Sequence, residues 1–302
     1  MKKKISIIEV GPRDGFQNIA EYIPVEEKLK IIGAMVRAGV RHIEHTSFVS
    51  PRAIPQLRDA EQVTKALLEQ YPDVEFFPLV PNLRGAQNAA ALGLKKVAYV
   101  VSLSVSHNKA NINRTHAESL AELLAIREAY PGLEICVDIA TAFGCPFEGK
   151  LTDPEILADF LADYVAAGVQ NFCLCDTIGI ADPAQLRRIL KTVTARYPQV
   201  VFEVHIHDTR NMGIANTLAA IECGITRVQS TLGGLGGCPF APGASGNTAT
   251  EDLVFMLNEM GYDTGIDFER ILAAAKYERT VVEGTYSGHH INIEKTTPCT
   301  GC

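Results

Sequence analysis

Two histidines near the end of an apolar segment give the sharpest chemical signal in the sequence. Within Val201–Asp208, His205 and His207 alternate with apolar residues. Successive side chains of a β-strand point to opposite faces, so both imidazoles lie on one face. The apolar face must pack against helices, and we therefore expect the imidazoles to face the interior of a barrel. Two imidazoles at this spacing form a natural chelate, which favours a metal site over a pair of hydrogen-bonded core histidines.

Oxygen donors elsewhere can complete such a site. Asp14 follows the first predicted strand, and Asn247 comes shortly after the eighth. Closure of a barrel brings these positions close to the two histidines. Mixed His, Asp and Asn ligation without thiolate suits Mg²⁺ or Mn²⁺, with Co²⁺ or Zn²⁺ as alternatives. Arg13 either neutralises Asp14 or presents a cation to a developing enolate oxygen.

Further polar residues stand in segments that are otherwise too apolar for them. Glu44 and His45 lie in the second strand, Asp138 in the fifth, and Asp176 ends the sixth. Buried carboxylates need partners. The alternation of side chains places Asp138 on the interior face, where it serves either the substrate or a buried ionic network.

A glycine-rich segment over residues 233–246 follows the eighth strand. Its glycines permit large backbone changes, which suits a mobile lid or a loop that cradles phosphate. Cys238 lies within it, either as a surface cysteine or within reach of a substrate.

Strand-like and helix-like patterns alternate along the chain and must position these residues. The expected strands are Ile5–Val10, His42–Phe48, Val74–Val80, Val97–Leu103, Glu134–Ala140, Asn171–Asp176, Val201–Asp208 and Arg227–Thr231. The expected helices are Val25–Ala38, Pro55–Gln70, Asn82–Leu92, Thr115–Ala129, Asp153–Ala167, Pro183–Tyr197, Asn211–Cys223, Thr248–Met260 and Asp267–Glu283.

Eight such repeats predict an α/β fold, a (β/α)₈ TIM barrel with extra C-terminal helices. A doubly wound nucleotide-binding sheet is the rival fold, but the first strand is not followed by the G-x-G-x-x-G pattern which that fold favours. We expect one catalytic domain over residues 1–302, with a helical extension over about 248–302.

Composition excludes several other classes of protein. The formal net charge of −7 over 302 residues disfavours nucleic-acid binding. No signal peptide or membrane-length apolar run is evident, so we expect a cytoplasmic protein without a membrane partner. The eight cysteines are expected to be reduced. The pairs Cys173/Cys175 and Cys299/Cys302 are weak metal or redox candidates.

Several motifs in order resemble the 3-hydroxy-3-methylglutaryl-CoA lyases, within the wider pyruvate carboxyltransferase-like group of barrel lyases and synthases. The matching segments are Gly11–Asn18 (GPRDGFQN), Thr46–Pro51 (TSFVSP), Asp176–Gly179 (DTIG), His205–Thr209 (HIHDT), Gly233–Pro239 (GGLGGCP) and Gly243–Asn247 (GASGN). The resemblance covers essentially the whole chain.

The resemblance implies cleavage of a 3-hydroxyacyl-CoA to acetyl-CoA and a keto acid, which is acetoacetate for the parent substrate. It assigns the metal to Asp14, His205, His207 and Asn247. A base removes the proton of the substrate hydroxyl, the C–C bond breaks, and a ketone and a thioester enolate remain.

Roles for other residues follow from the same resemblance. Arg13 stabilises the enolate oxygen, Glu44 orients Arg13 or a metal-bound water, and Cys238 supplies a proton to the enolate carbon. We expect Arg13, Gln17, His45, Asp138 and Asp176 to contact the substrate. A homodimer is also expected, and Asn108, Lys109 and Asn111 are candidate contacts for CoA.

The chain departs from the family pattern at several positions. His45 and Cys173 stand where a small residue and serine are usual, and Cys136 and Asp138 replace an arginine and a tyrosine. Phe16 and Ile19 replace leucine and glutamate. A lost arginine removes a partner for a substrate carboxylate, and an added carboxylate repels one. Our hypothesis is retained C–C chemistry on a changed acyl group.

Three alternatives stay open. One is a lyase, aldolase or synthase of the same group acting on another acyl or 2-oxo acid substrate, such as citramalyl-CoA. Another is a metal-dependent hydrolase, which has no need of Cys238. The third is a binding or scaffold protein without catalytic activity, against which the intact set of candidate ligands argues.

Overall fold

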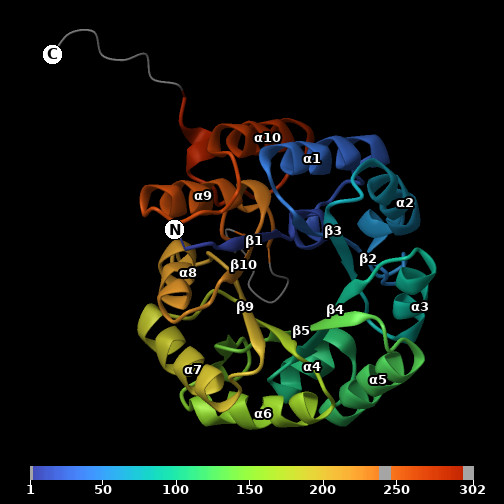
Figure 1. Cartoon of the computed structure of the whole chain (residues 1–302), viewed down its shortest axis with the longest axis vertical. Helices are drawn as coiled ribbons and strands as arrows, with labels where there is room; N and C mark the ends of the chain where they lie inside the picture. Colours follow the sequence, from blue (N-terminus) through green and yellow to red (C-terminus); the bar gives the residue numbers. More distant parts are fainter. Residues whose placement is uncertain (1–2, 238–245, 295–302) are drawn as a thin grey trace, which may run out of the picture.

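A closed barrel of eight parallel strands forms the centre of the molecule in a computed structural model that describes residues 3–237 and 246–294. The order around the barrel is β1, β10, β9, β8, β5, β4, β3, β2, with β1 hydrogen-bonded to both β10 and β2. Figure 1 looks down the barrel and shows the helices outside it. The predicted (β/α)₈ barrel is therefore confirmed.

The strand bounds agree with the predicted segments to within a few residues. They are β1 Ser6–Glu9, β2 His42–Ser47, β3 Glu75–Leu79, β4 Lys96–Ser102, β5 Glu134–Ala140, β8 Asn171–Asp176, β9 Val201–Ile206 and β10 Arg227–Ser230. A small antiparallel pair, β6 Gly144–Cys145 and β7 Gly149–Lys150, follows β5. The continuous apolar segments predicted these strands well because both faces of a parallel barrel strand are buried.

Helices connect the strands on the outside. They are α1 Val25–Ala38, α2 Ala60–Gln70, α3 Leu83–Ala91, α4 Val105–Ile112, α5 His116–Ala129, α6 Pro154–Ala166, α7 Pro183–Arg196, α8 Gly213–Glu222, α9 Thr250–Glu259 and α10 Phe268–Val281. Side-chain caps fix several starts. Asp182, for example, accepts hydrogen bonds from the backbone of Ala184 and Gln185 at the start of α7.

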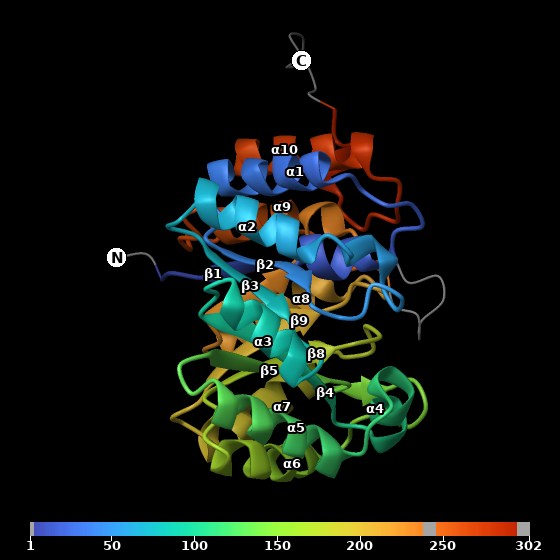
Figure 2. The same cartoon turned by 90° about the vertical axis from the view of Figure 1, so that its right-hand side faces the viewer.

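The C-terminal helices complete the ring around the barrel. Figures 1 and 2 show α10 beside α1, with α9 on its other side. The predicted C-terminal helices are thus present, and they cover the part of the barrel where the first and last strands meet. Within the described part of the chain, no helix combines the length and apolar character that a membrane crossing requires.

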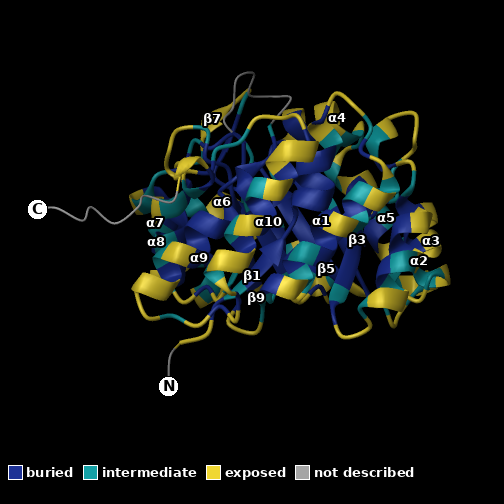
Figure 3. Ribbon diagram, turned by 90° about the horizontal axis from the view of Figure 1, so that it is seen from above, coloured by how far each residue is buried: buried dark blue, intermediate teal, exposed yellow. Residues whose placement is uncertain are grey.

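Two apolar regions hold the elements together. The larger one lies between strands and helices, and Figure 3 shows the strands buried beneath partly exposed helices. The smaller one, Ile8, Val10, Phe77 and Ala98, lies apart from it inside the barrel. The space above this inner cluster is lined by polar side chains at the carboxyl ends of the strands, where barrel enzymes place their sites.

Candidate metal centre and active site

A short turn after β1 brings Arg13 and Asp14 to the carboxyl end of the barrel. Residues Gly11–Gly15 form a single π-helical turn in which every residue is buried. The Asp14 amide donates to the Val10 carbonyl at 2.7 Å. Gly11 is required at the start, because a Cβ there would lie 2.7 Å from the Glu9 carboxylate. Such wide turns are rare and often occur at functional sites.

Asp14, His205 and His207 form a compact cluster of metal-ligating groups. One ligand atom from each lies within 4.8 Å of the others, and all three residues are buried. His205 Nε2 is 4.0 Å from Asp14 Oδ2. Among the described residues this is the single such cluster of His, Cys, Asp and Glu side chains. The interior position predicted for the two imidazoles agrees with this geometry.

Asn247 joins the cluster from the segment after β10. Its Nδ2 donates to Asp14 Oδ2 at 2.7 Å, and its Oδ1 is buried without a hydrogen-bond partner in the part of the chain that the structure describes. An isolated bridge pairs its backbone with His207. A buried amide oxygen without a partner beside a carboxylate and two imidazoles is a donor set that fits a divalent cation.

The charges in the cluster suit metal binding at neutral pH. Burial alone raises the pKa of Asp14, but Arg13 and the two histidines lower it to about 2. Burial lowers the pKa of His207 to about 4, and that of His205 is lowered by the same cause. The carboxylate is therefore ionised and both imidazoles are neutral, which are the protonation states that metal ligation requires.

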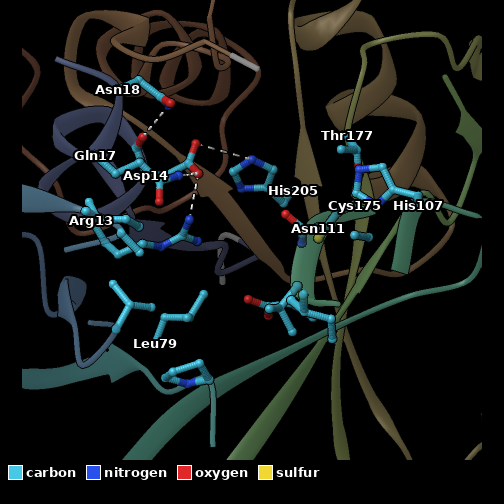
Figure 4. Close-up of a pocket in the computed structure, with 18 of the residues that line it drawn as sticks. Arg13, Asp14, Gln17, Asn18, Leu79, His107, Asn111, Cys175, Thr177 and His205 are labelled. Atoms are coloured by element: carbon cyan, nitrogen blue, oxygen red, sulfur yellow. Dashed lines mark hydrogen bonds and ion pairs between the residues drawn. The ribbon is translucent and has the colours of Figure 1, made fainter. Parts of the chain in front are cut away.

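Arg13 is held between two carboxylates. Its Nη1 donates to Asp14 Oδ1 at 2.6 Å, and its Nε donates to Glu44 Oε2 at 2.8 Å. Gln17 also donates to Asp14 Oδ1 at 3.0 Å. Figure 4 shows Asp14 between Arg13 and His205, with the Arg13 guanidinium at the edge of the cavity. The structure shows the contact of Glu44 with Arg13, and the orienting role of Glu44 stays a prediction.

Asp138 faces the same cavity, as the alternation of side chains along β5 predicted. It is 4% exposed, and its Oδ1 has no hydrogen-bond partner among the described residues. Burial, and then the nearby charge of Glu44, raise its pKa well above the usual value for aspartate. Burial therefore favours the protonated form of this carboxyl group, and in that form it can donate a hydrogen bond.

The cavity above these residues has a volume of about 710 Å³. Its inner wall includes Leu79, Val100 and Cys175, and its mouth includes Asn111 and Arg114. Asn111 comes from α4, a short helix that the sequence analysis did not predict because its residues do not form a clear apolar face. The size and the mixed lining suit a small acyl group with a longer substituent at the mouth.

The structure places two of the residues predicted to contact the substrate away from the cavity. His45 points to the helix layer, where its ring nitrogens contact the Phe77 carbonyl and the Thr64 hydroxyl. The reason is alternation, since Glu44 beside it takes the interior face of β2. Asp176 accepts hydrogen bonds from the Ile180 and Ala181 amides, so it shapes the loop after β8. Neither residue lines the cavity.

Asn108 and the candidate cysteines have other positions than a contact with the substrate or a metal would require, or lie outside the described residues. Asn108 is buried and bonds to Ser102 and Arg114, so it supports α4 from within. Cys173 is buried beneath Cys175, with the two sulfur atoms 4.0 Å apart. Cys238, Cys299 and Cys302 lie outside the described residues, as does most of the predicted lid.

The described start of the glycine-rich segment does not offer a phosphate cradle. The Leu232 amide donates to Glu9 Oε1, and the Gly233 amide donates to Glu251 Oε2, both at 2.9 Å. Both backbone amides therefore already donate hydrogen bonds within the protein and cannot donate to a phosphate. The buried carboxylates anchor the segment next to the metal ligands.

Fold and site together define a class: a parallel (β/α)₈ barrel with a buried His/His/Asp cluster that could hold a metal ion, and a paired arginine beside it at the carboxyl ends of the strands. Comparisons with known proteins then give the family. A family model described as HMGL-like matches residues 4–277, so the chain belongs to that family. The resemblance seen in the motifs is confirmed.

Two of the relatives that match most of the chain are lyases by name. A hydroxymethylglutaryl-CoA lyase of Bacillus subtilis is 41% identical over 279 residues, 91% of this chain and 92% of its own length. An (R)-citramalyl-CoA lyase of Chloroflexus aurantiacus is 40% identical over 284 residues, 90% and 89% of the two chains.

A solved HMG-CoA lyase structure from Acinetobacter baumannii, in complex with coenzyme A and 3-methylmalate, has a TM-score of 0.88. It is 37% identical and matches 97% of this chain and 98% of its own.

Proposed function

We propose that the chain is a metal-dependent carbon–carbon lyase that cleaves a 3-hydroxyacyl-CoA to acetyl-CoA and a keto acid. The observation that carries the proposal is the buried cluster of Asp14, His205 and His207, with Arg13 fixed beside it. Asn247 supplies a fourth donor through its Oδ1, which accepts no hydrogen bond from the described residues. A divalent cation held there acts as a Lewis acid that makes the substrate hydroxyl more acidic.

The residues around the cluster have roles that follow from their contacts. A general base takes the proton of the substrate hydroxyl, whose oxygen becomes the carbonyl of the keto acid, while the electrons of the C–C bond pass to the thioester carbonyl and form an enolate. Arg13 is already held in place by two carboxylates, so it stabilises the enolate oxygen without reorganisation. Glu44 fixes the direction of the guanidinium. The role of Cys238, which lies outside the described residues, rests on the resemblance alone: it supplies a proton to the enolate carbon, which completes acetyl-CoA.

We further propose that the acyl group differs from 3-hydroxy-3-methylglutaryl. Burial raises the pKa of the Asp138 carboxyl, whose Oδ1 has no hydrogen-bond partner among the described residues, and a protonated carboxyl there favours a substituent that accepts a hydrogen bond. Both arginines that line the cavity, Arg13 and Arg114, are already paired with Asp14, Glu44 and Glu122. Arg13 is assigned to the enolate oxygen and Arg114 is paired with Glu122, so the described lining offers no further arginine for a second substrate carboxylate.

A panel of hydroxyacyl-CoA thioesters tests this proposal. We expect a related thioester, for which citramalyl-CoA is the first candidate, to give a higher kcat/KM than 3-hydroxy-3-methylglutaryl-CoA. The isosteric Asp138→Asn variant should change the ranking of substrates while divalent-cation affinity stays within about twofold. If 3-hydroxy-3-methylglutaryl-CoA is the best substrate of the unaltered protein, the changed acyl group is wrong and the lyase chemistry stands.

The setting of the enzyme belongs to the proposal as well. We propose Mg²⁺ or Mn²⁺ as the cation, because hard oxygen donors accompany the histidines. We also propose a cytoplasmic homodimer with an acyl-CoA substrate and neither a nucleic-acid nor a membrane partner. Light scattering of the purified protein tests the dimer, with a mass of one chain, 32.8 kDa, as the contrary result.

A further inference from the structure

Gln229, on β10, contacts the metal-binding cluster through His205. The two residues are partners in the parallel register of β9 and β10. Gln229 Oε1 lies 3.0 Å from His205 Nδ1, and the glutamine is 4% exposed. It is not one of the metal ligands, and its position suits a residue that acts on a ligand from behind.

The orientation of the Gln229 amide is fixed by a second contact. Its Nε2 lies 3.4 Å from Glu203 Oε2, and the other oxygen of Glu203 is paired with Arg227 Nε. A carboxylate bound to arginine only accepts hydrogen bonds, so the NH₂ group of Gln229 must face Glu203. Its carbonyl oxygen therefore faces His205.

The fixed amide in turn fixes the imidazole. An amide oxygen only accepts, so His205 must carry its proton on Nδ1. The lone pair of the neutral ring then stands on Nε2, the atom that is 4.0 Å from Asp14 Oδ2. A series of side-chain contacts therefore leads to the metal-binding cluster from Arg227, at the amino-terminal end of β10. It passes through Glu203 and Gln229 to His205.

We infer that Gln229 is a positioning residue that selects the Nδ1–H tautomer of His205 and so prepares Nε2 for the cation. The inference rests on the proposed metal site, but the tautomer exists without a cation. A ring that is held in one tautomer and orientation before binding loses less freedom when the cation binds. Partners of this kind typically change metal affinity by about 10- to 100-fold.

The test uses full-length protein, free of metal and labelled with ¹⁵N at histidine. Long-range ¹H–¹⁵N spectra report which ring nitrogen carries the proton, and a His205→Gln sample assigns the signals. Three variants are compared. Gln229→Leu removes the acceptor, Gln229→Glu keeps an acceptor at the same place, and Glu203→Gln removes the group that fixes the amide. Mn²⁺ affinity is measured on the same samples by calorimetry, and thermal unfolding checks that each variant is folded.

In unaltered protein and in Gln229→Glu we expect a single Nδ1–H tautomer. In Gln229→Leu we expect a mixture of tautomers and a 10- to 100-fold weaker Mn²⁺ affinity, with a smaller loss of the same kind in Glu203→Gln. An unchanged tautomer and an affinity within twofold in Gln229→Leu would overturn the inference. A Nε2–H tautomer in the unaltered protein would do so as well. If the unaltered protein shows the expected tautomer but binds no divalent cation, the proposed metal site is wrong and the role of Gln229 in setting the tautomer stands.

Discussion

Replacement of Arg13 by glutamine separates its catalytic role from metal binding. Arg13 makes three short contacts with carboxylates, at 2.8 Å and 2.7 Å to Glu44 and at 2.6 Å to Asp14. A cation held on two sides is a preorganised donor for an enolate oxygen. Loss of one such donor typically costs about 3 to 4 kcal/mol in the transition state, so we expect kcat to fall by about 10²- to 10³-fold.

The same change should not weaken metal binding. Arg13 Nη1 occupies Asp14 Oδ1 and competes with a cation for that carboxylate. Its removal therefore leaves divalent-cation affinity unchanged or increases it. The cost to stability is larger, because Glu44 and Asp14 lose the guanidinium that is paired with both of them in a buried site, and breaking a buried ion pair typically costs about 3 to 5 kcal/mol.

The assay measures product formation by mass spectrometry over a range of cation concentrations, well below the unfolding temperature of the variant. Arg13→Lys is the matched control, since it keeps the charge but cannot reproduce the fork of donors. We expect it to recover part of the lost kcat. A fall in kcat of less than tenfold in Arg13→Gln, or its complete recovery at high cation concentration, would refute the assignment of Arg13 to the enolate oxygen.

Three further predictions test other parts of the site. Cys238→Ser should lower kcat by about 10²- to 10⁴-fold while calorimetric cation affinity is retained; full activity would instead favour hydrolysis. His207→Gln should weaken cation binding at least 100-fold. Asp176→Asn, another substitution of a buried residue, is the control and should bind the cation as the unaltered protein does. Equal losses of cation affinity in the two variants would argue against His207 as a ligand. Burial raises the pKa of Glu251 from 4.5 to about 8, so the contribution of this group to stability is fully present below about pH 4.5 and is lost as the pH rises through about 8. Urea unfolding should therefore show Glu251→Gln gaining on the order of 4 kcal/mol over the unaltered protein between pH 4.5 and 8, whereas parallel pH curves would contradict the burial argument.

The barrel and the clustering of Asp14, His205 and His207 could be predicted from the sequence because each rests on a local pattern. Apolar strands alternating with helices predict a parallel sheet, and the count of eight predicts closure. The interior position of His205, His207 and Asp138 follows from alternation along one strand. None of these inferences needed the register between strands.

The errors arise where a side chain depends on contacts that are distant in sequence. His45 follows Glu44 directly, so only one of them can face the interior, and the strand pairing shifts between Glu44 and Thr46. The Asp176 carboxylate accepts hydrogen bonds from backbone amides of the loop that follows it, so it does not face the substrate. The contact of Gln229 with His205 depends on the register of β9 and β10, which alternation within one strand does not give.

The most direct test of the central claim is the product balance of purified protein with a hydroxyacyl-CoA thioester, with Mn²⁺ or Mg²⁺ and then with a chelator. We predict equal amounts of acetyl-CoA and a keto acid in the presence of the cation, and loss of both after chelation. Free CoA with an intact hydroxy acid would mean hydrolysis, and product formation that persists after complete cation removal would contradict a metal-dependent lyase.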